Sequence, residues 1–163
     1  GCSTDMITPH YRCRDFDWTS FEALRNTAKM AYEMAGITDP SNDLDLAEVH
    51  DCFSITEMCI YEDFGFIPRG TAYEHINEGY FERTGKLPVN VDGGLKCFGH
   101  PVGASGIRMT YEIYKQLQYK VDNPARQLKD VHRGLSQTFG GPPQIAACMI
   151  LGNEKGSGRS GRG

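Results

Sequence analysis

The sequence lacks the residue spacings that mark metal-binding and disulfide-stabilised proteins. Its six cysteines contain no Cys-x-x-Cys pair, and its five histidines show neither a His-Glu-x-x-His interval nor a zinc-finger interval. Zinc sites and thiol–disulfide centres usually show such intervals. We therefore predict no metal site and no resident cofactor, and we expect the thiols to stay reduced.

Charge and hydrophobicity exclude two further classes of partner. The net charge is −4, from 17 basic and 21 acidic residues, so there is no excess of basic residues to bind nucleic acid or an anionic membrane. No apolar run approaches the length of a transmembrane helix, which is about 20 residues. The N-terminal region also lacks the pattern of a signal peptide. We expect a cytoplasmic protein.

Local sequence signals predict three helices in the first half of the chain. Thr19–Glu22 and Ser54–Glu57 both have the pattern of a capping box, in which a hydroxyl and a carboxylate satisfy backbone N–H groups at a helix start. After the first box, apolar residues recur at helical spacing until Gly36, and the second helix is expected to end at Gly65. A shorter helix is predicted at 71–79.

The second half predicts a long loop, one helix and two strands. Segment 82–99 is rich in Gly, Pro and Asn, which indicates a loop. A helix follows from about Val102 and presents Ile107, Tyr111, Tyr114 and Leu117. Strands are predicted at 134–139 and 145–151, joined by a tight turn at 140–143. The second of these strands is a nearly continuous apolar run, which is typical of a strand buried on both faces.

These elements predict an α/β layered fold with helices packed on a mixed sheet. A further short strand is predicted at 46–50, so helices and strands alternate along the chain. The length of 163 residues fits one domain, which we place at 1–152. Residues 153–163 are rich in Gly, Ser and Arg and are predicted to be a flexible tail.

One histidine lies in a glycine-rich loop. Residues 90–106 include five glycines and place His100, followed by Pro101, ahead of the predicted helix. Glycine allows the backbone to approach a ligand closely, and a helix N-terminus carries a positive partial charge that favours an anion. We predict that His100 helps to hold an anion or enolate. A structural loop histidine is the alternative.

A second histidine stands where a strand meets a helix. His50 ends the strand predicted at 46–50 and precedes Asp51 and Cys52. Ligand-binding groups of α/β sheets gather at the carboxyl ends of strands, so His50 is a second candidate catalytic residue. Asp51 could orient one of its ring nitrogens. A structural histidine is again the alternative, and Cys52 is more often a small buried hydrophobe than a nucleophile.

These two segments resemble motifs of the thiolase superfamily, from its C-terminal half. Glu48–Ser54 is similar to a strand-to-helix motif, in the His-Asp-Cys-Phe form found in the sterol carrier protein type and in archaeal and bacterial acetyl-CoA acetyltransferase-like thiolases. Gly99–Pro101 matches the Gly-His-Pro motif. The resemblance implies that His100 and His50 stabilise the oxyanion or enolate of a coenzyme A thioester. It also implies a substrate site that includes Gly99, Gly141 and Phe53.

A third motif of the family is altered. Thiolases carry a basic cysteine in a Cys-x-Gly motif, and alignment on Gly140 and Gly141 places Thr138 at the position of that cysteine. A threonine hydroxyl is not a base near neutral pH unless another group activates it. Thr138 is therefore a candidate site residue that argues against condensation and thiolysis by the usual route. Cys148 is expected to lie in the core.

The resemblance covers nearly the whole chain but only one of the two similar halves of a thiolase. The nucleophilic cysteine of the family lies in the N-terminal half, so we expect it outside this chain. Gly1–Asp5 is similar to the exit from the first strand of the C-terminal half, and we expect that strand to be missing. Alone, the half would expose a sheet edge and the face that packs on the other half. We expect the isolated chain to be inactive, whether it is a fragment or a subunit of a split protein.

Three functions are consistent with the sequence. The preferred one is the C-terminal catalytic domain of an acetyl-CoA acetyltransferase-type enzyme of lipid metabolism, which acts on acyl-CoA as a homo-oligomer, most simply a homodimer. The second is a thiolase-like aldolase that breaks a carbon–carbon bond on a CoA thioester with a small zinc-containing OB-fold partner. The third is a non-catalytic lipid carrier or scaffold in which the histidines are structural.

Overall fold

A four-stranded mixed sheet forms the centre of the chain. The structure is a computed structural model that describes residues 2–4, 17–141 and 145–153. The strand order is β1-β4-β3-β2. β3 (Arg133–Gly140) pairs antiparallel with β4 (Ile145–Gly152) and parallel with β2 (Leu46–Glu48), and β1 (Cys2–Thr4) pairs antiparallel with β4. The three strands predicted from the sequence are present, and β2 stops two residues before His50.

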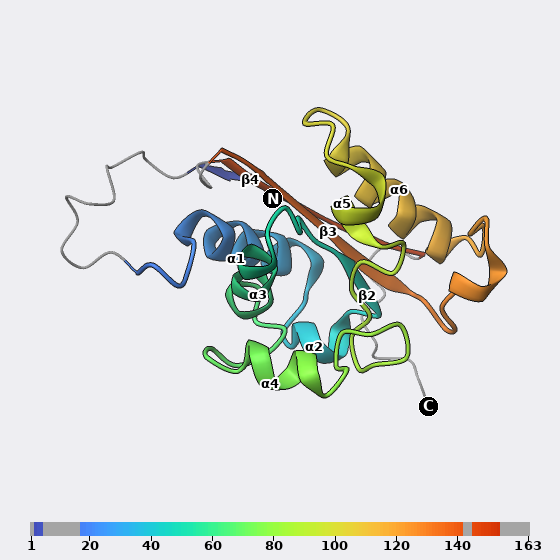
Figure 1. Cartoon of the computed structure of the whole chain (residues 1–163), viewed down its shortest axis with the longest axis horizontal. Helices are drawn as coiled ribbons and strands as arrows, with labels where there is room; N and C mark the ends of the chain where they lie inside the picture. Colours follow the sequence, from blue (N-terminus) through green and yellow to red (C-terminus); the bar gives the residue numbers. More distant parts are fainter. Residues whose placement is uncertain (1, 5–16, 142–144, 154–163) are drawn as a thin grey trace.

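Helices cover the two faces of this sheet, which confirms the α/β layered fold (Figure 1). On one side, α1 (Glu22–Ala35) packs on β4 and β1, and α3 (Ser54–Asp63) packs beside α1. On the other side, α6 (Ser105–Leu117) packs on β3 and β2. The remaining helices are short: α2 (Pro40–Asp43), α4 (Ala72–Asn77), α5 (Gly94–Phe98) and the 3-10 helix η2 (Pro124–Arg126).

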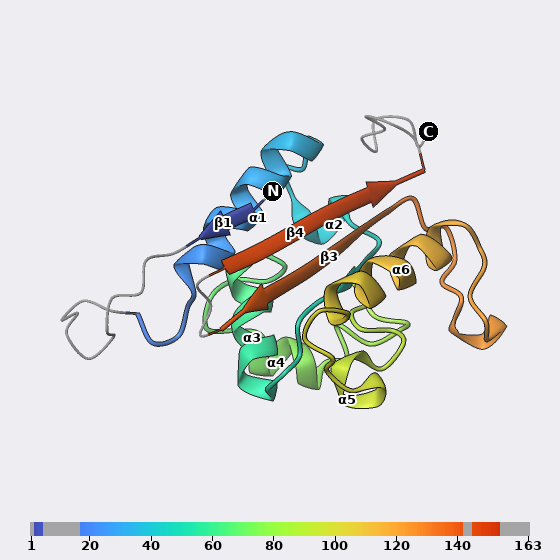
Figure 2. The ribbon, with the colours of Figure 1, turned by 90° about the horizontal axis from the view of Figure 1, so that it is seen from above.

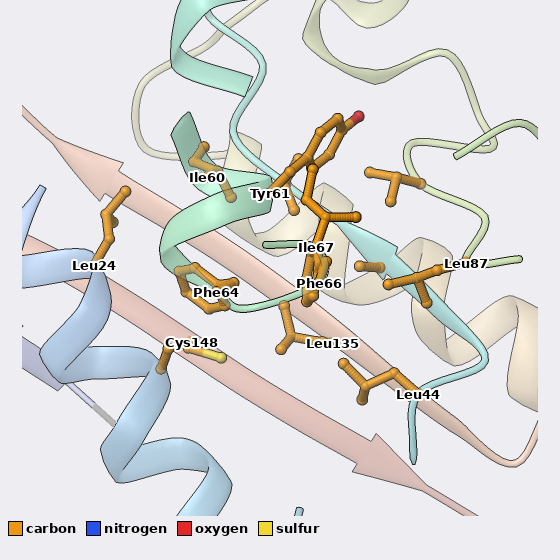
Figure 3. Close-up of a cluster of buried hydrophobic side chains, with 14 of the residues drawn as sticks. Leu24, Leu44, Ile60, Tyr61, Phe64, Phe66, Ile67, Leu87, Leu135 and Cys148 are labelled. Atoms are coloured by element: carbon orange, nitrogen blue, oxygen red, sulfur yellow. The ribbon is translucent and has the colours of Figure 1, made fainter. Parts of the chain in front are cut away.

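The main hydrophobic core lies between the sheet and the α1 and α3 side. Figure 3 shows side chains from α1, α3, the loops and the strands meeting there, among them Leu24, Phe64, Phe66, Leu135 and Cys148. Cys148 is 2% exposed, which confirms its predicted place in the core. A smaller cluster under α6 contains Leu46, Ile113, Leu117, Leu128 and Val131. Alternate residues of β2 therefore reach different cores, as a two-residue period requires.

β4 is buried on one face only, contrary to the prediction from its apolar run. Ala146 and Cys148 point into the main core, whereas Ile145 and Met149 are 56% and 51% exposed. The reason is that α6 lies mainly along β3 and β2 and covers the same side of β4 only near Leu151, so the first part of β4 stays uncovered there (Figure 2). Val102 and Ile107 are also exposed and line a hollow with Met149, and Tyr111 is exposed one turn further along α6. We call this surface the open face: Val102, Ile107, Tyr111, Ile145 and Met149.

Tertiary contacts replace the two predicted capping boxes. The Ser20 hydroxyl donates to the carboxylate of Asp63 at the end of α3, and the Phe21 N–H donates to the same carboxylate at 2.7 Å. Ser54 is the first residue of α3 and makes no capping hydrogen bond, while Glu57 accepts hydrogen bonds from Tyr61 and Asn90. α1 does end at Gly36, whose φ of +67° is the left-handed conformation that glycine favours.

Other departures from the predicted elements are local. Cys2–Thr4 form an edge strand, where we expected the chain to have already left one. The predicted loop 82–99 contains α5 and a parallel bridge between Val89 and Ala47. The predicted tail beyond Asn153 and the Pro142–Pro143 part of the turn lie outside the described residues. Among the helices that the structure describes, none is both long and apolar enough to cross a membrane.

Candidate active site

His50 is fixed immediately beyond the end of β2. Its side chain and backbone are 3% exposed, and its N–H donates to Oε1 of Gln137 on β3 at 3.2 Å. Its Nδ1 atom lies 3.1 Å from Oγ1 of Thr138, which is within hydrogen-bond distance. The imidazole also packs on the Phe139 ring, with centroids 4.2 Å apart. Because β2 and β3 are parallel neighbours, the sheet itself brings His50 and Thr138 together.

The surroundings of His50 keep its imidazole neutral. Burial lowers the pKa of His50 to about 4 from an ordinary value of 6.5, and the positive charge of His100 in its protonated form acts in the same direction. The carboxylate of Asp51 opposes this shift only weakly. At neutral pH, His50 can therefore accept or donate a hydrogen bond without introducing a charge.

His100 lies on the exposed loop between α5 and α6. Its Nδ1 atom is 2.7 Å from the hydroxyl of Ser105, the buried first residue of α6. The same hydroxyl is 3.2 Å from the carbonyl oxygen of Pro101. The helix start predicted near Val102 is thus three residues later, and its first side chain supports the histidine.

The two predicted histidines meet in space. Their ring centroids are 4.7 Å apart, and the ring planes are nearly perpendicular, at 87°. One ring comes from the end of a strand and is buried, while the other comes from a loop and is exposed to solvent. The pair therefore presents nitrogen atoms of two imidazoles at the surface end of β2 and β3, next to the hydroxyl of Thr138.

Asp51 holds the loop that leads to His100 and is not the partner of His50 Nδ1. The Asp51 side chain is buried, and its Oδ1 accepts a hydrogen bond from the N–H of Leu95 at 2.8 Å. Gly94 packs against the same carboxylate: a Cβ atom there would lie 2.4 Å from Oδ2, and the φ of Gly94 is +65°. The role we predicted for Asp51, orienting a ring nitrogen, is instead filled by Thr138.

Asn90, in the segment that leads to His100, holds the segment that carries His50. Its side-chain Oδ1 accepts from the N–H of Val49 at 2.8 Å, and its Nδ2 donates to Glu57 at 2.9 Å. Its own N–H donates to the carbonyl of Ala47 at 3.0 Å. The backbone of Asn90 has a φ of +51°, a conformation in which asparagine is enriched. Segments 47–51 and 90–95 thus hold each other through side chain to backbone hydrogen bonds.

The three residues predicted to line the substrate site lie on the exposed rims of these segments. Gly99 immediately precedes His100, and Gly141 follows the end of β3; both are exposed and have positive φ values, +77° and +73°. Phe53 precedes α3 and is 69% exposed. All three residues are therefore accessible from solvent, and Gly99 is next to His100 in the chain.

Several residues that shape the site received no predicted role. Asn90, Ser105 and Arg108 each support a histidine-bearing segment. Glu48 was quoted only as part of a motif, yet it is a fully buried carboxyl group in a strand of apolar neighbours. A charged residue between Ala47 and Val49 was a signal of a buried partner, because a lone buried charge is costly. Within the described residues, no group of three or more His, Cys, Asp or Glu side chains is arranged to hold a metal ion.

Comparison with known proteins defines the class. Residues 7–153 match the family described as thiolase C-terminal domain-like, so the chain belongs to that family. It is 39% identical over 135 residues to an acetyl-CoA acetyltransferase of Methanothermobacter thermautotrophicus, covering 83% of this chain and 34% of the relative. It is 38% identical over 98 residues to human sterol carrier protein 2, covering 60% of this chain and 18% of that protein. These findings confirm the resemblance noted from the motifs.

A solved structure shows the same fold at low sequence identity. The "Ltp2-ChsH2(DUF35) aldolase" superimposes with a TM-score of 0.74 over 95% of this chain and 39% of the other, at 22% identity. The chain thus spans about a third of the length of the first acetyltransferase relative and a similar share of this structure.

Proposed function

We propose that this chain is the C-terminal catalytic region of a thiolase-like acyltransferase that acts on coenzyme A thioesters, of the acetyl-CoA acetyltransferase type. The observation that carries the proposal is the edge-on pair of His50 and His100, 4.7 Å apart at the end of β2. Two imidazole donors close to one point suit the negative charge that develops on a thioester oxygen. Membership of the family and the acetyltransferase relatives support this choice of substrate.

Ser105 holds the His100 ring in place for this task. An oxyanion requires an N–H donor at Nε2, so Nδ1 must accept a hydrogen bond when the ring is neutral. The Ser105 hydroxyl can donate its single proton either to Nδ1 at 2.7 Å or to the Pro101 carbonyl at 3.2 Å. Both contacts form at once if Ser105 donates to the Pro101 carbonyl and accepts from Nδ1–H, whereas donation to Nδ1 gives up the Pro101 bond. The proposal requires the second arrangement, which leaves Nε2 of a neutral ring protonated and free to donate.

The nucleophile of the proposed reaction lies outside this chain. A cysteine thiolate attacks the thioester carbonyl, the carbonyl oxygen takes up the negative charge beside His100 and His50, and the CoA thiol leaves with a proton. Of the cysteines in the described part of the chain, Cys59 and Cys148 are buried, and burial raises the pKa values of Cys52, Cys59 and Cys148. A raised pKa disfavours the thiolate, so none of these three is suited to the role.

The open face is the surface on which we propose that the N-terminal half of the thiolase-like protein packs. Val102, Ile107 and Met149 are exposed and line one hollow of about 270 Å³, which also reaches Thr138. The relatives contain roughly twice as much further sequence as this chain covers. We propose that this further part, carrying the nucleophile, packs on the open face, and that the complete protein is a cytoplasmic homo-oligomer, most simply a homodimer.

Thr138 supports a second candidate function. Its hydroxyl is engaged with Nδ1 of His50 and occupies the position of the basic cysteine in thiolases, so a residue able to deprotonate acetyl-CoA is absent there. A retro-aldol reaction needs stabilisation of the thioester enolate but not that cysteine. The fold is shared with an aldolase whose structure includes a DUF35 protein. In this alternative, a small zinc-containing OB-fold protein would be the partner.

Turnover assays with the longest natural polypeptide containing this chain separate the two functions. One assay supplies acetoacetyl-CoA plus CoA and follows thiolysis. A parallel assay supplies a β-hydroxyacyl-CoA and follows carbon–carbon cleavage. Thr138→Cys should increase thiolysis at least tenfold if the acyltransferase proposal holds, because it restores a base at the end of β3. Carbon–carbon cleavage by the wild type, without any increase in thiolysis in Thr138→Cys, would favour the second candidate.

A control is Thr71→Cys before α4, whose hydroxyl donates to the carbonyl of Pro68 at 2.7 Å, away from the histidine pair and the open face. This variant should leave both reactions unchanged. If the wild type and Thr138→Cys turn over neither thioester, while the protein binds acyl chains, the non-catalytic reading is correct and both proposed reactions are wrong.

A further inference from the structure

Arg108 contacts both segments that carry the histidines. It projects from the first turns of α6, and its Nη1 pairs with the carboxylate of Asp92 in loop 82–99. Its Nη2 lies 3.7 Å from Oε2 of Glu48, the last residue of β2. Its guanidinium carbon also lies 5.1 Å from the centroid of the Phe98 ring, the last residue of α5. One side chain therefore reaches three separate elements.

These contacts are placed close to the histidines along the chain. Glu48 precedes His50 by two residues, and Phe98 precedes His100 by two residues. Asp92 also accepts the N–H of Gly94 at 2.9 Å, which fixes the start of α5. Arg108 thus connects the strand before one histidine to the short helix before the other.

The burial of Glu48 and Asp92, together with the shape of the guanidinium group, makes the contacts of Arg108 specific for arginine. The Glu48 side chain is 0% exposed, that of Asp92 is 3% exposed and that of Arg108 is 20% exposed. Burial raises the pKa of Glu48, and the positive charge of Arg108 opposes that shift. Only a planar guanidinium can face two carboxylates from two edges and lie over an aromatic ring at the same time; lysine offers a single point charge.

We infer that Arg108 is a positioning residue that sets the separation between His50 and His100 by holding β2, the loop at Asp92 and the end of α5 to α6. The inference rests on the proposed function for its effect on turnover, but not for its effect on geometry. Arg108 makes no direct contact with either imidazole among the contacts of the described residues. Its influence passes through the backbone segments that it anchors.

The chain contains a matched control in Arg126. Its Nη1 lies 3.7 Å from the buried Glu112, and its side chain is 24% exposed, close to the values for Arg108 and Glu48. Arg126 lies in η2, and its carbonyl accepts from Gln116 of α6. Substitution of Arg126 leaves Glu112 paired with Lys115 at 3.1 Å, whereas substitution of Arg108 removes the cation from both Glu48 and Asp92. Only Arg108 joins the two histidine segments.

The test compares Arg108→Lys and Arg108→Met with Arg126→Lys and Arg126→Met in the longest natural polypeptide containing this chain. Nuclear magnetic resonance of ¹³C-labelled histidine reports the pKa of each imidazole, and urea unfolding reports stability. For Arg108→Met, we expect the measured pKa of His50 to rise towards that of a solvated histidine as His100 and its loop move away. We expect Arg108→Lys to give a smaller rise, and the Arg126 variants to give none.

Turnover supplies the second readout. Misplacing a reacting group by about 1 Å can cost about 100-fold, so Arg108→Met should lower kcat by about that factor and leave KM nearly unchanged. In a His100→Ala background, Arg108→Met should cost no further activity, because a residue that acts through His100 has nothing left to position. Arg126→Met should lower stability less than Arg108→Met, because Glu112 keeps Lys115, and it should leave kcat unchanged.

The outcomes separate the possibilities. The inference is wrong if the Arg108 and Arg126 variants change the His50 pKa and kcat equally, or if the Arg108 and His100 losses multiply. If Arg108→Met does not fold, the milder Arg108→Lys decides by the same readouts. If the wild type has no acyl-CoA turnover but Arg108→Met still shifts the His50 pKa, the proposed function fails while the positioning role stands.

Discussion

The turn that carries His50 and the loop that carries His100 reach the same point by different means. His50 follows a buried strand and is held by Gln137 and Thr138 of the neighbouring strand. The loop of His100 is exposed at its tip and depends on side chains for its shape, chiefly Asp51 and Asp92 at the start of α5. The strand before His50 is also paired with β3 along its backbone, whereas the loop depends on a few individual contacts.

This difference indicates how each histidine responds to change. A substitution at His50 disturbs a packed, desolvated position, so stability and chemistry change together. A substitution at His100 disturbs a side chain that is mostly in solvent, so its effect is confined to chemistry. Substitutions in the loop should act on the placement of His100 and leave the sheet intact.

The largest effect should come from His100→Ala. Loss of one oxyanion-stabilising donor costs turnover about 100- to 1000-fold, and the exposed ring contributes little to packing. Steady-state kinetics with the thioester substrate would measure the loss, and urea unfolding would show an unchanged midpoint. Undiminished turnover would refute the role assigned to His100, and a large loss of stability would remove the contrast with His50.

The next effect should come from His50→Ala, compared with His50→Asn. Alanine keeps the backbone bond to Gln137 but leaves the Thr138 hydroxyl and the Phe139 ring facing a cavity, so both stability and turnover should fall, turnover by about 10- to 100-fold. Asparagine keeps a hydrogen-bonding group at this position and should lose clearly less. Equal losses from the two variants would mean that polarity at residue 50 does not matter.

Gly94→Ala should distort the loop without disturbing the sheet. The added Cβ would meet the Asp51 carboxylate at 2.4 Å, and the φ of +65° is unfavourable for alanine. We expect a loss of about 1–3 kcal/mol in unfolding free energy and a parallel fall in turnover. The control is Gly103→Ala in the same loop region, where a Cβ would have no atom within 4 Å. Similar losses in both variants would contradict the proposed contact.

The last difference concerns the pH dependence of stability. Because the pKa of His50 is lowered to about 4 from 6.5 by burial and by His100, the unfolded chain binds more protons than the folded chain between these values. This contribution to stability is complete above pH 6.5 and is lost as the pH falls towards 4. Urea unfolding at several pH values should show a shallower acid loss for His50→Asn. Parallel curves for the two proteins would show that His50 titrates normally.

Much of the fold and the identity of the two histidines were predictable from local signals. The apolar run of β4, the end of α1 at Gly36 and the Gly-His-Pro segment each act within a few residues, so the sequence displays them directly. The meeting of His50 and His100 followed from the resemblance to a family, since no local spacing joins positions 50 residues apart.

The remaining features depend on tertiary partners that local patterns do not contain. Thr19 has the sequence context of a helix cap, but its hydroxyl donates to Asp17 at 2.7 Å and accepts from Arg69, which lies 50 residues away. Asp51 stands next to His50 in sequence, but the backbone of Leu95 is a better-placed donor to its carboxylate. The apolar run of β4 could not reveal which side α6 would leave uncovered, because that depends on the position of the helix across the sheet.

The open face also governs how the chain behaves in solution by itself. Its exposed aliphatic and aromatic side chains remain in contact with water unless another surface covers them. Salts that are excluded from apolar surfaces, such as sulfate, raise the free energy of this exposure, and urea lowers it. Purified alone, the chain should therefore become more prone to self-association as sulfate is added, through the surface that a partner would otherwise occupy.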